Sequence, residues 1–267
     1  MKPSPAWFAL CCVALVALGG CAAHPRPDAH VPPFARVPFA PFSRDDAIAI
    51  ALREWRSFGA PVDDTPPDPQ RSLAIADDAK PERAAGLWQR VGEYWWLGLD
   101  ADSRESAWTG KHDAAGSVFP AARDGDYAWS AAFISYVMRI AGARDGFPYS
   151  AAHSTYVNAA RVGAPGLRVR AERPESYAPR PGDLICMSRS WSKNLRYDDL
   201  PTEFVGHCDL VVDATPGTLT VVGGNVDDAV TAKHVPISSN QGTLATPDGR
   251  VLDERYPWFV VVRVLYD

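Results

Sequence analysis

The sequence predicts an α+β fold, in which helices come first along the chain and strands follow. Up to about residue 160, apolar residues recur at the spacing of one buried helical face. From about residue 180 onwards they form short runs separated by Gly, Pro and Asp, as in strands joined by turns. The chain has 267 residues, which is enough for one well-buried domain of ordinary size.

Residues 1–20 are not expected to belong to this domain, because they have the layout of an export signal. Lys2 precedes the apolar run AWFALCCVALVALGG, which is too short to cross a membrane as a stable helix. The run ends in LGGC, which resembles the bacterial lipobox. This resemblance implies cleavage before Cys21, lipidation of the Cys21 thiol and, because Ala22 rather than Asp follows, a position on the periplasmic face of the outer membrane.

Residues 21–42 are rich in Pro and Ala and show no helical or strand periodicity, so we expect a semi-rigid tether there. The domain is expected to span residues 43–267. Its first helix begins at the N-cap residue Ser43, and Gly59 is well placed to end it. A second helix is expected within 83–99, with a core-facing stripe of Leu87, Val91, Tyr94 and Trp95.

A third helix is expected in the stretch DYAWSAAFISYVMRIAG, residues 126–142. The preceding residues 100–126 are rich in Asp, Gly, Ser and Ala and predict a long surface loop. Within the helix Ser130 belongs to an apolar stripe, so its side chain is expected to face the sheet. The other members of this stripe are Phe133, Ile134, Val137 and Ala141.

The C-terminal part predicts an antiparallel sheet of about four to six strands. The expected strands are 183–188, 205–213, 218–224, 230–237 and 257–265. A turn at 214–217 would pair Asp213 with Thr218. It would also place alternate residues on one apolar face, namely Cys208, Leu210 and Val212. Cys186 and Cys208 then lie on neighbouring strands, and the sequence leaves open whether they form a disulfide.

Composition and spacing argue against several classes of ligand. The formal net charge of −5 gives no electrostatic footprint for nucleic acid. His207 and Asp209 are two residues apart, a spacing that metal ligands also use, but no pattern supplies a third ligand. We therefore expect no metal site, no cofactor and no nucleic-acid partner.

Four segments in order resemble the CHAP-type and NlpC-type cell-wall hydrolases, which are papain-like cysteine peptidases: WSAAFISYVMRIAG, PRPGDLI, GHCDLVV and GGN. The stretch RVGEYWWLGL and the leader more closely resemble domain-of-unknown-function family 2272. The resemblance implies a single papain-like domain over 43–267. Its N-terminal helices would pack on an antiparallel sheet or half-barrel.

The same resemblance implies a catalytic triad of Ser130, His207 and Asn225. Ser130 stands where that architecture carries its nucleophilic cysteine, in the first turn of a helix, where developing negative charge is favoured. The imidazole of His207 would take the proton and the amide of Asn225 would orient the ring. Strict alternation turns Asn225 to the other face of its strand, so this contact requires a bulge, which Gly223 and Gly224 would permit.

Each triad member also has a simpler structural interpretation. Ser130 could be only a small residue that lets its helix approach the sheet, His207 a hydrogen-bonded buried side chain, and Asn225 a turn residue. A hydroxyl also lacks the easily formed thiolate of cysteine, so Ser130 needs an aligned base. Further residues expected near the cleft are Tyr127, Trp129, His153 and Asp209.

Two classes of function therefore stay open. The first is a lipid-anchored peptidoglycan amidase or endopeptidase that uses Ser130, and an ester or a protein peptide bond is a weaker choice of substrate. The alternative is a catalytically silent papain-like module that binds peptidoglycan or an envelope protein. In both cases the expected partners are peptidoglycan or cell-wall peptides, together with the membrane that holds the lipid on Cys21.

Overall fold

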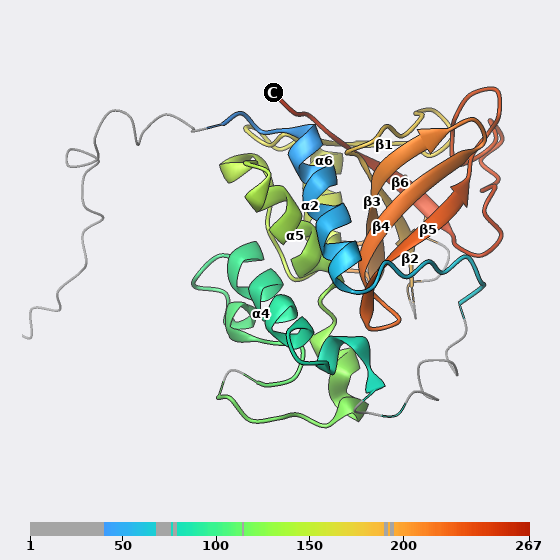
Figure 1. Ribbon diagram of the computed structural model, residues 1–267. Helices are drawn as coiled ribbons and strands as arrows, with labels where there is room; N and C mark the ends of the chain where they lie inside the picture. Colours follow the sequence, from blue (N-terminus) through green and yellow to red (C-terminus); the bar gives the residue numbers. More distant parts are fainter. Residues whose placement is uncertain (1–39, 68–75, 77–78, 114, 190–191, 193–194) are drawn as a thin grey trace, which may run out of the picture. The chain divides into compact units, whose positions relative to one another are not determined.

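The computed structural model describes residues 40–67, 76, 79–113, 115–189, 192 and 195–267 (Figure 1). The expected signal peptide, the lipidation site Cys21 and nearly all of the tether lie outside these residues. The described part is a mixed α+β unit, with four α-helices and an open antiparallel sheet of six strands. No helix in it is long and apolar enough to cross a membrane.

The six strands lie in the order β1-β6-β2-β3-β4-β5. Their bounds are β1 (Val169–Glu172), β2 (Leu184–Ser188), β3 (Gly206–Thr215), β4 (Thr218–Val226), β5 (Ala229–Pro236) and β6 (Trp258–Val264). Five of them match the predicted strands closely. The short edge strand β1 was not predicted, because it has only four residues and pairs with β6, which is distant in sequence. The α+β class and the antiparallel sheet are thereby confirmed.

The predicted register of the β3–β4 hairpin was wrong. Thr215, not Asp213, pairs with Thr218, so the turn consists of only two residues. Gly217 occupies the second turn position with a φ of +82°, a conformation that favours glycine. A register shift between Val211 and Asp213 then absorbs one residue. The predicted apolar face is nevertheless correct, because Cys208, Leu210 and Val212 all belong to the helix-covered core.

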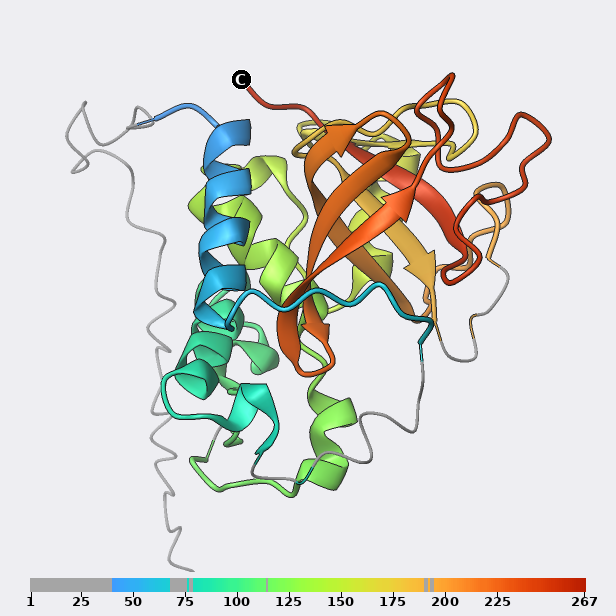
Figure 2. The ribbon, with the colours of Figure 1, turned by 45° about the vertical axis from the view of Figure 1, so that its right-hand side comes forward.

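The helices are α2 (Arg44–Ser57), α4 (Leu87–Gly98), α5 (Ser130–Ile140) and α6 (His153–Val162). Ser43 caps α2 as predicted, since its hydroxyl oxygen accepts the backbone N–H of Asp46 at 3.1 Å. Figures 1 and 2 show α2 and α5 side by side next to the sheet, with α4 beside α5 on the side away from it. Among the described residues, helices therefore cover only one face of the sheet.

Loops cover the second face of the sheet. The helix-side core contains the even-numbered residues of β2 and β3, such as Cys186 and Leu210. The opposite core contains their odd-numbered neighbours Ile185 and Val211. Leu244, Tyr256 and other residues of the long segment between β5 and β6 close this second core. Burial on both faces explains why these strands read as nearly continuous apolar runs.

A buried carboxylate joins α2 to α4. Glu54 is fully buried, and its side chain accepts hydrogen bonds from Tyr94 at 2.8 Å and from the Nε of Arg90 at 3.0 Å. Burial alone would raise the pKa of Glu54, but the hydrogen bonds from Arg90 and its neighbours outweigh burial and lower it. The charged carboxylate therefore stays paired, and it fixes the position of α4 against α2.

The expected long loop over 100–126 contains two short 3-10 helices, at Arg104–Ala107 and Ala121–Tyr127. Two more such turns lie at Pro81–Arg83 and Arg144–Gly146. None of the four is long enough to show helical periodicity in the sequence.

Cys186 and Cys208 lie on the neighbouring strands β2 and β3, as predicted. The structure adds that they occupy directly opposite positions. Their sulfur atoms form a disulfide, which settles the question that the sequence left open. Both residues are buried in the helix-side core. The bridge therefore closes the chain segment between two central strands of the sheet.

We expect the disulfide to stabilise the fold by about 3 kcal/mol, because its closed segment spans 22 residues and cross-linking such a segment removes entropy from the unfolded chain. Urea unfolding of the double variant Cys186→Ser/Cys208→Ser, compared with the wild type, measures this difference. Peptide mapping of unreduced, alkylated protein provides the control. Two alkylated thiols at these positions in the native protein would contradict the bridge.

Candidate functional site

Ser130 is the first residue of α5, as the sequence predicts. The residue before it, Trp129, makes no side-chain cap, so the first backbone N–H groups of the helix point out of its end. The side chain of Ser130 is buried, and the whole residue is 6% exposed. Its Oγ lies 2.7 Å from Nε2 of His153, which is hydrogen-bond distance.

His153 begins α6 and brings its ring to Ser130 from a second helix. On the other side of the ring, Nδ1 contacts the hydroxyl of Tyr156, one helical turn further along. A phenol hydroxyl can both donate and accept hydrogen bonds, so it can accept one from a protonated Nδ1. In that tautomer Nε2 carries the lone pair and accepts the hydroxyl proton of Ser130. This is the arrangement that a general base requires.

Burial keeps His153 neutral. The ring is enclosed, and burial together with the nearby His207 lowers the pKa of His153 well below its usual value, while Asp209 acts in the opposite direction. Burial likewise raises the pKa of Tyr156, so the phenol stays protonated. At neutral pH the imidazole is thus uncharged, with one ring nitrogen unprotonated.

A second buried group lies beside this pair. His207 and Asp209, on β3, are joined by a contact of 2.8 Å between Nε2 and Oδ1. The other carboxylate oxygen of Asp209 lies 2.7 Å from Nζ of Lys233, on β5. All three side chains are almost completely inaccessible to solvent. These contacts connect ionisable side chains of β3 and β5 across the strand between them, inside the protein.

Gly223 makes this crossing possible, because it lies on β4, the strand between β3 and β5. A Cβ atom at this position would lie 1.8 Å from Oδ1 of Asp209 and 2.8 Å from Nε2 of His207. No side chain fits there without displacing the ion pair. Packing around the ion pair therefore explains why the first residue of the GGN stretch is a glycine.

The ionisation states in this group follow from burial and charge. Burial alone would raise the pKa of Asp209, but Lys233 and His207 beside it hold the carboxylate well below its usual range. Burial lowers the pKa of His207 to about 4, against the opposing influence of Asp209. His207 is consequently neutral at pH 7 and donates Nε2–H to Asp209.

The remaining nitrogen of His207 is without a partner in the described part of the chain. Nδ1 is buried and makes no hydrogen bond there. The His207 ring lies against the His153 ring, with centroids 5.5 Å apart. A buried acceptor without a partner costs free energy, so this nitrogen calls for an explanation, such as a proton or a ligand that it binds.

The structure pairs the predicted triad members differently from the expected scheme. Ser130 bonds to His153, a residue expected only near the cleft, and His207 bonds to Asp209. Asn225 has a φ of +56° at the register shift between Gly223 and Val226. Within the described residues its side chain makes no hydrogen bond to His207. The roles assigned to the three residues stay predictions.

The other expected cleft residues have structural surroundings. Trp129 is buried, stacks with Phe58 and hydrogen-bonds through its Nε1 to Glu82. Tyr127 is half-buried and stacks on Phe119. Asp209 is the carboxylate of the buried group. The only hint of the Ser130 partner in the sequence is the placing of His153 and Tyr156 one helical turn apart.

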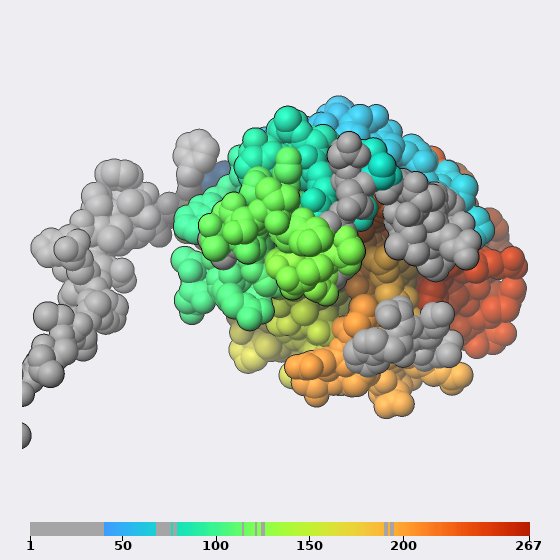
Figure 3. Space-filling model, turned by 90° about the horizontal axis from the view of Figure 1, so that it is seen from below, coloured from blue at the N-terminus to red at the C-terminus, as the bar shows by residue number. Residues whose placement is uncertain are grey.

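One hollow of the surface lies beside the start of α6, although Ser130 and His153 do not line it. A hollow of about 370 Å³ between α4 and the start of α6 is lined by Tyr149, Ser150, Ala151 and Ala152, which directly precede His153. Figure 3 shows a recess between the green segment around residues 110–125 and the amber and orange segments around 180–205. No group of three His, Cys, Asp or Glu that could hold a metal occurs among the residues described.

Acid should destabilise the protein through His207. Its pKa in the fold is about 4 against an ordinary 6.5, so between these values the unfolded chain binds a proton that the folded chain does not. This contribution to stability is complete above about pH 6.5 and falls by about 3 kcal/mol as the pH approaches about 4. Urea unfolding over this pH range measures it.

The variant His207→Gln should show a flatter dependence, because its amide still donates to Asp209 but does not titrate. His234→Gln, which changes an exposed histidine on β5, serves as the matched control. A pH dependence in His207→Gln as steep as that of the wild type would exclude this role for His207.

Comparison with known proteins identifies the family but supplies no activity. No curated protein and no solved structure matches the chain. The sequence model of one family, described as an uncharacterized protein conserved in bacteria (DUF2272), matches residues 82–264. The match includes all the residues of the buried site and more than half of the chain. The chain therefore belongs to the DUF2272 family.

Proposed function

We propose that the protein is a hydrolase of the bacterial cell envelope that cleaves amide bonds in peptidoglycan, with Ser130 as the nucleophile and His153 as its base. The observation that carries the proposal is the contact of 2.7 Å between Ser130 Oγ and His153 Nε2 at the start of α5. A serine becomes nucleophilic only when an aligned base takes its proton. In this pair the two atoms already lie at hydrogen-bond distance.

The reaction would follow acyl-transfer chemistry. Ser130 Oγ attacks the amide carbonyl carbon while its proton passes to Nε2 of His153. The carbonyl electron pair moves onto oxygen, and the open N–H groups at the start of α5 stabilise this oxyanion. His153 then gives the proton to the departing amine, which leaves an ester on Ser130. Water, deprotonated by His153, releases the acid and restores the hydroxyl.

The second buried group would support the base in this scheme. When His153 takes a proton, the charge of Asp209 favours the imidazolium, as its effect on the pKa of His153 indicates. His207 lies between the two and acts as a positioning residue, held by Asp209 and packed against the ring of His153. Asn225 has no part in this scheme.

Topology and sequence support the choice of a cell-wall substrate. A nucleophile at the start of a helix packed on an antiparallel sheet is the arrangement implied by the resemblance to CHAP-type and NlpC-type hydrolases. The proposed base departs from this resemblance, because His153 lies on α6 and not on the central strand that carries His207. The LGGC ending of the leader supports lipidation at Cys21 and a place on the periplasmic face of the outer membrane. Peptidoglycan would be within reach of such an anchored domain.

One observation favours a second function. Ser130 is 6% exposed, His153 is 5% exposed and His207 is fully buried. A substrate carbonyl can reach Ser130 only if neighbouring residues move aside. If they do not, the fold would serve as a catalytically silent module that binds cell-wall peptides.

Labelling by a fluorophosphonate, which reacts only with activated serines, distinguishes these functions. We expect labelling of the wild type and release of peptides from purified sacculi, and a loss of both by about a thousandfold or more in Ser130→Ala and His153→Gln. Ser135→Ala, in the same helix, is the matched control. Asn225→Ala should retain activity.

Binding to sacculi with no labelling and no released peptide would refute the hydrolase and leave the silent module. Loss of activity in Asn225→Ala with activity retained in His153→Gln would instead return the role of base to His207. Circular dichroism of each variant confirms that its fold is intact.

A further inference from the structure

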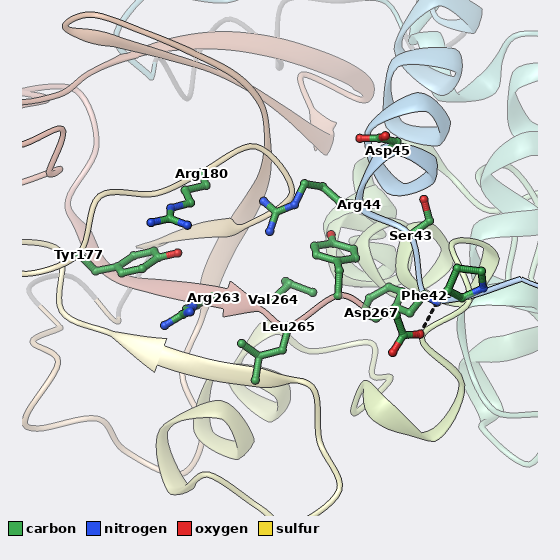
Figure 4. Close-up of a pocket in the computed structure, with 12 residues that line it drawn as sticks. Phe42, Ser43, Arg44, Asp45, Tyr177, Arg180, Arg263, Val264, Leu265 and Asp267 are labelled. Carbon is green, nitrogen blue, oxygen red and sulfur yellow. Dashed lines mark hydrogen bonds between the residues drawn. The ribbon is translucent and has the colours of Figure 1, made fainter.

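A hollow lined by arginine lies at the opposite end of α5 from Ser130. It is formed by the start of α2, the segment before β2 and the end of β6, and its volume is about 430 Å³ (Figure 4). The backbone N–H of Ser43 bonds to the carbonyl of Ala141, just after α5, which places this hollow away from the buried site. Three of its lining residues are Arg44, Arg180 and Arg263.

The three guanidinium groups are only weakly engaged by the protein. Arg44 lies over the ring of Tyr266 at 5.0 Å and donates to a backbone carbonyl. Arg263 lies over the ring of Tyr177 at 5.5 Å, and its contact with Glu172 is long, at 3.7 Å. The Arg180 side chain has no ion pair or hydrogen bond within the described residues. Each therefore keeps donors free for a ligand.

Nearby carboxylates cancel only part of this charge. Asp267 accepts the backbone N–H of Phe42 at 2.7 Å and pairs with Arg168, which lies outside the lining. Asp183 lies beneath the hollow, where Tyr177 and two backbone N–H groups occupy both its oxygens. Asp45 is the remaining acidic residue of the lining, against three arginines.

The wall of the hollow is preformed. Gly182 has a φ of +93°, and a Cβ atom there would lie 2.9 Å from Cγ of Arg44 and 3.0 Å from the ring of Tyr266. The Tyr266 hydroxyl donates to the carbonyl of Gly182 at 2.8 Å. These contacts fix the Tyr266 ring and, through it, the place of Arg44. Little ordering of the Arg44 side chain would then be required on binding.

We infer that this hollow binds a phosphate group. Arginine matches phosphate oxygens with paired N–H donors, and three arginines line this hollow. The volume admits a phosphate together with a small organic substituent. The group could belong to a phospholipid headgroup or to a free phosphate compound. The inference does not depend on the proposed hydrolase activity.

Titration of the full-length protein with inorganic phosphate at low salt, followed by calorimetry, tests the site. We expect binding that weakens by about tenfold or more in Arg180→Ala/Arg263→Ala. Arg250→Ala removes an exposed arginine elsewhere and should bind like the wild type. Absence of phosphate binding to the wild type, or an equal loss in Arg250→Ala, would overturn the inference.

A second arm identifies the source of the phosphate. Vesicles of phosphatidylcholine with and without phosphatidylglycerol are sedimented with the wild type and with the double variant. Sedimentation that requires both the anionic lipid and the two arginines assigns the hollow to a lipid headgroup. Equal sedimentation of both proteins, together with arginine-dependent phosphate binding, assigns it to a free phosphate compound. Unaltered hydrolysis of sacculi by the double variant would show that this site is separate from Ser130.

Discussion

The ion pair between Asp209 and Lys233 is the interaction on which the site depends. It connects β3 to β5 beneath Gly223, and the second carboxylate oxygen of Asp209 holds His207. Burying one of these charges without the other costs several kcal/mol, so the pair must form as a unit. The His207 ring packs on His153, and His153 bonds to Ser130, so this contact helps to hold the His153 ring in place.

Close approach of backbones gives the site its second constraint. A Cβ atom on Gly224 would lie 2.6 Å from Cβ of Phe133, and one on Gly98 would lie 2.6 Å from the carbonyl oxygen of Ala132. The two glycines therefore let α5 lie directly between β4 and α4. Consecutive glycines on β4 thus serve two different ends, since Gly223 makes room for the ion pair and Gly224 makes room for the helix that carries Ser130.

Local features of the fold could be predicted from the sequence, whereas contacts between distant elements could not. The Ser43 cap, the inward stripe on α5 and the placing of Cys186 and Cys208 on neighbouring strands follow from the sequence pattern alone. The Ser130–His153 bond depends on where α6 docks, which no periodicity records. Nothing in the strand sequence around Lys233 indicates that its side chain is buried. Its partner can be recognised only from the strand order, in which β4 lies between β3 and β5. The hairpin register was missed because the turn has two residues rather than four, and the bulge further along offsets only one residue of this difference.

The central claim is that His153 presents an unprotonated Nε2 to Ser130. Nitrogen NMR of protein labelled at the imidazole rings reads this tautomer directly, with Ser130→Ala and His153→Gln used to assign the signals. The account predicts that at neutral pH His153 carries its proton on Nδ1, facing Tyr156, and that His207 carries its proton on Nε2, facing Asp209. A proton on Nε2 of His153 would make the ring a donor to Ser130 and would contradict its role as the base.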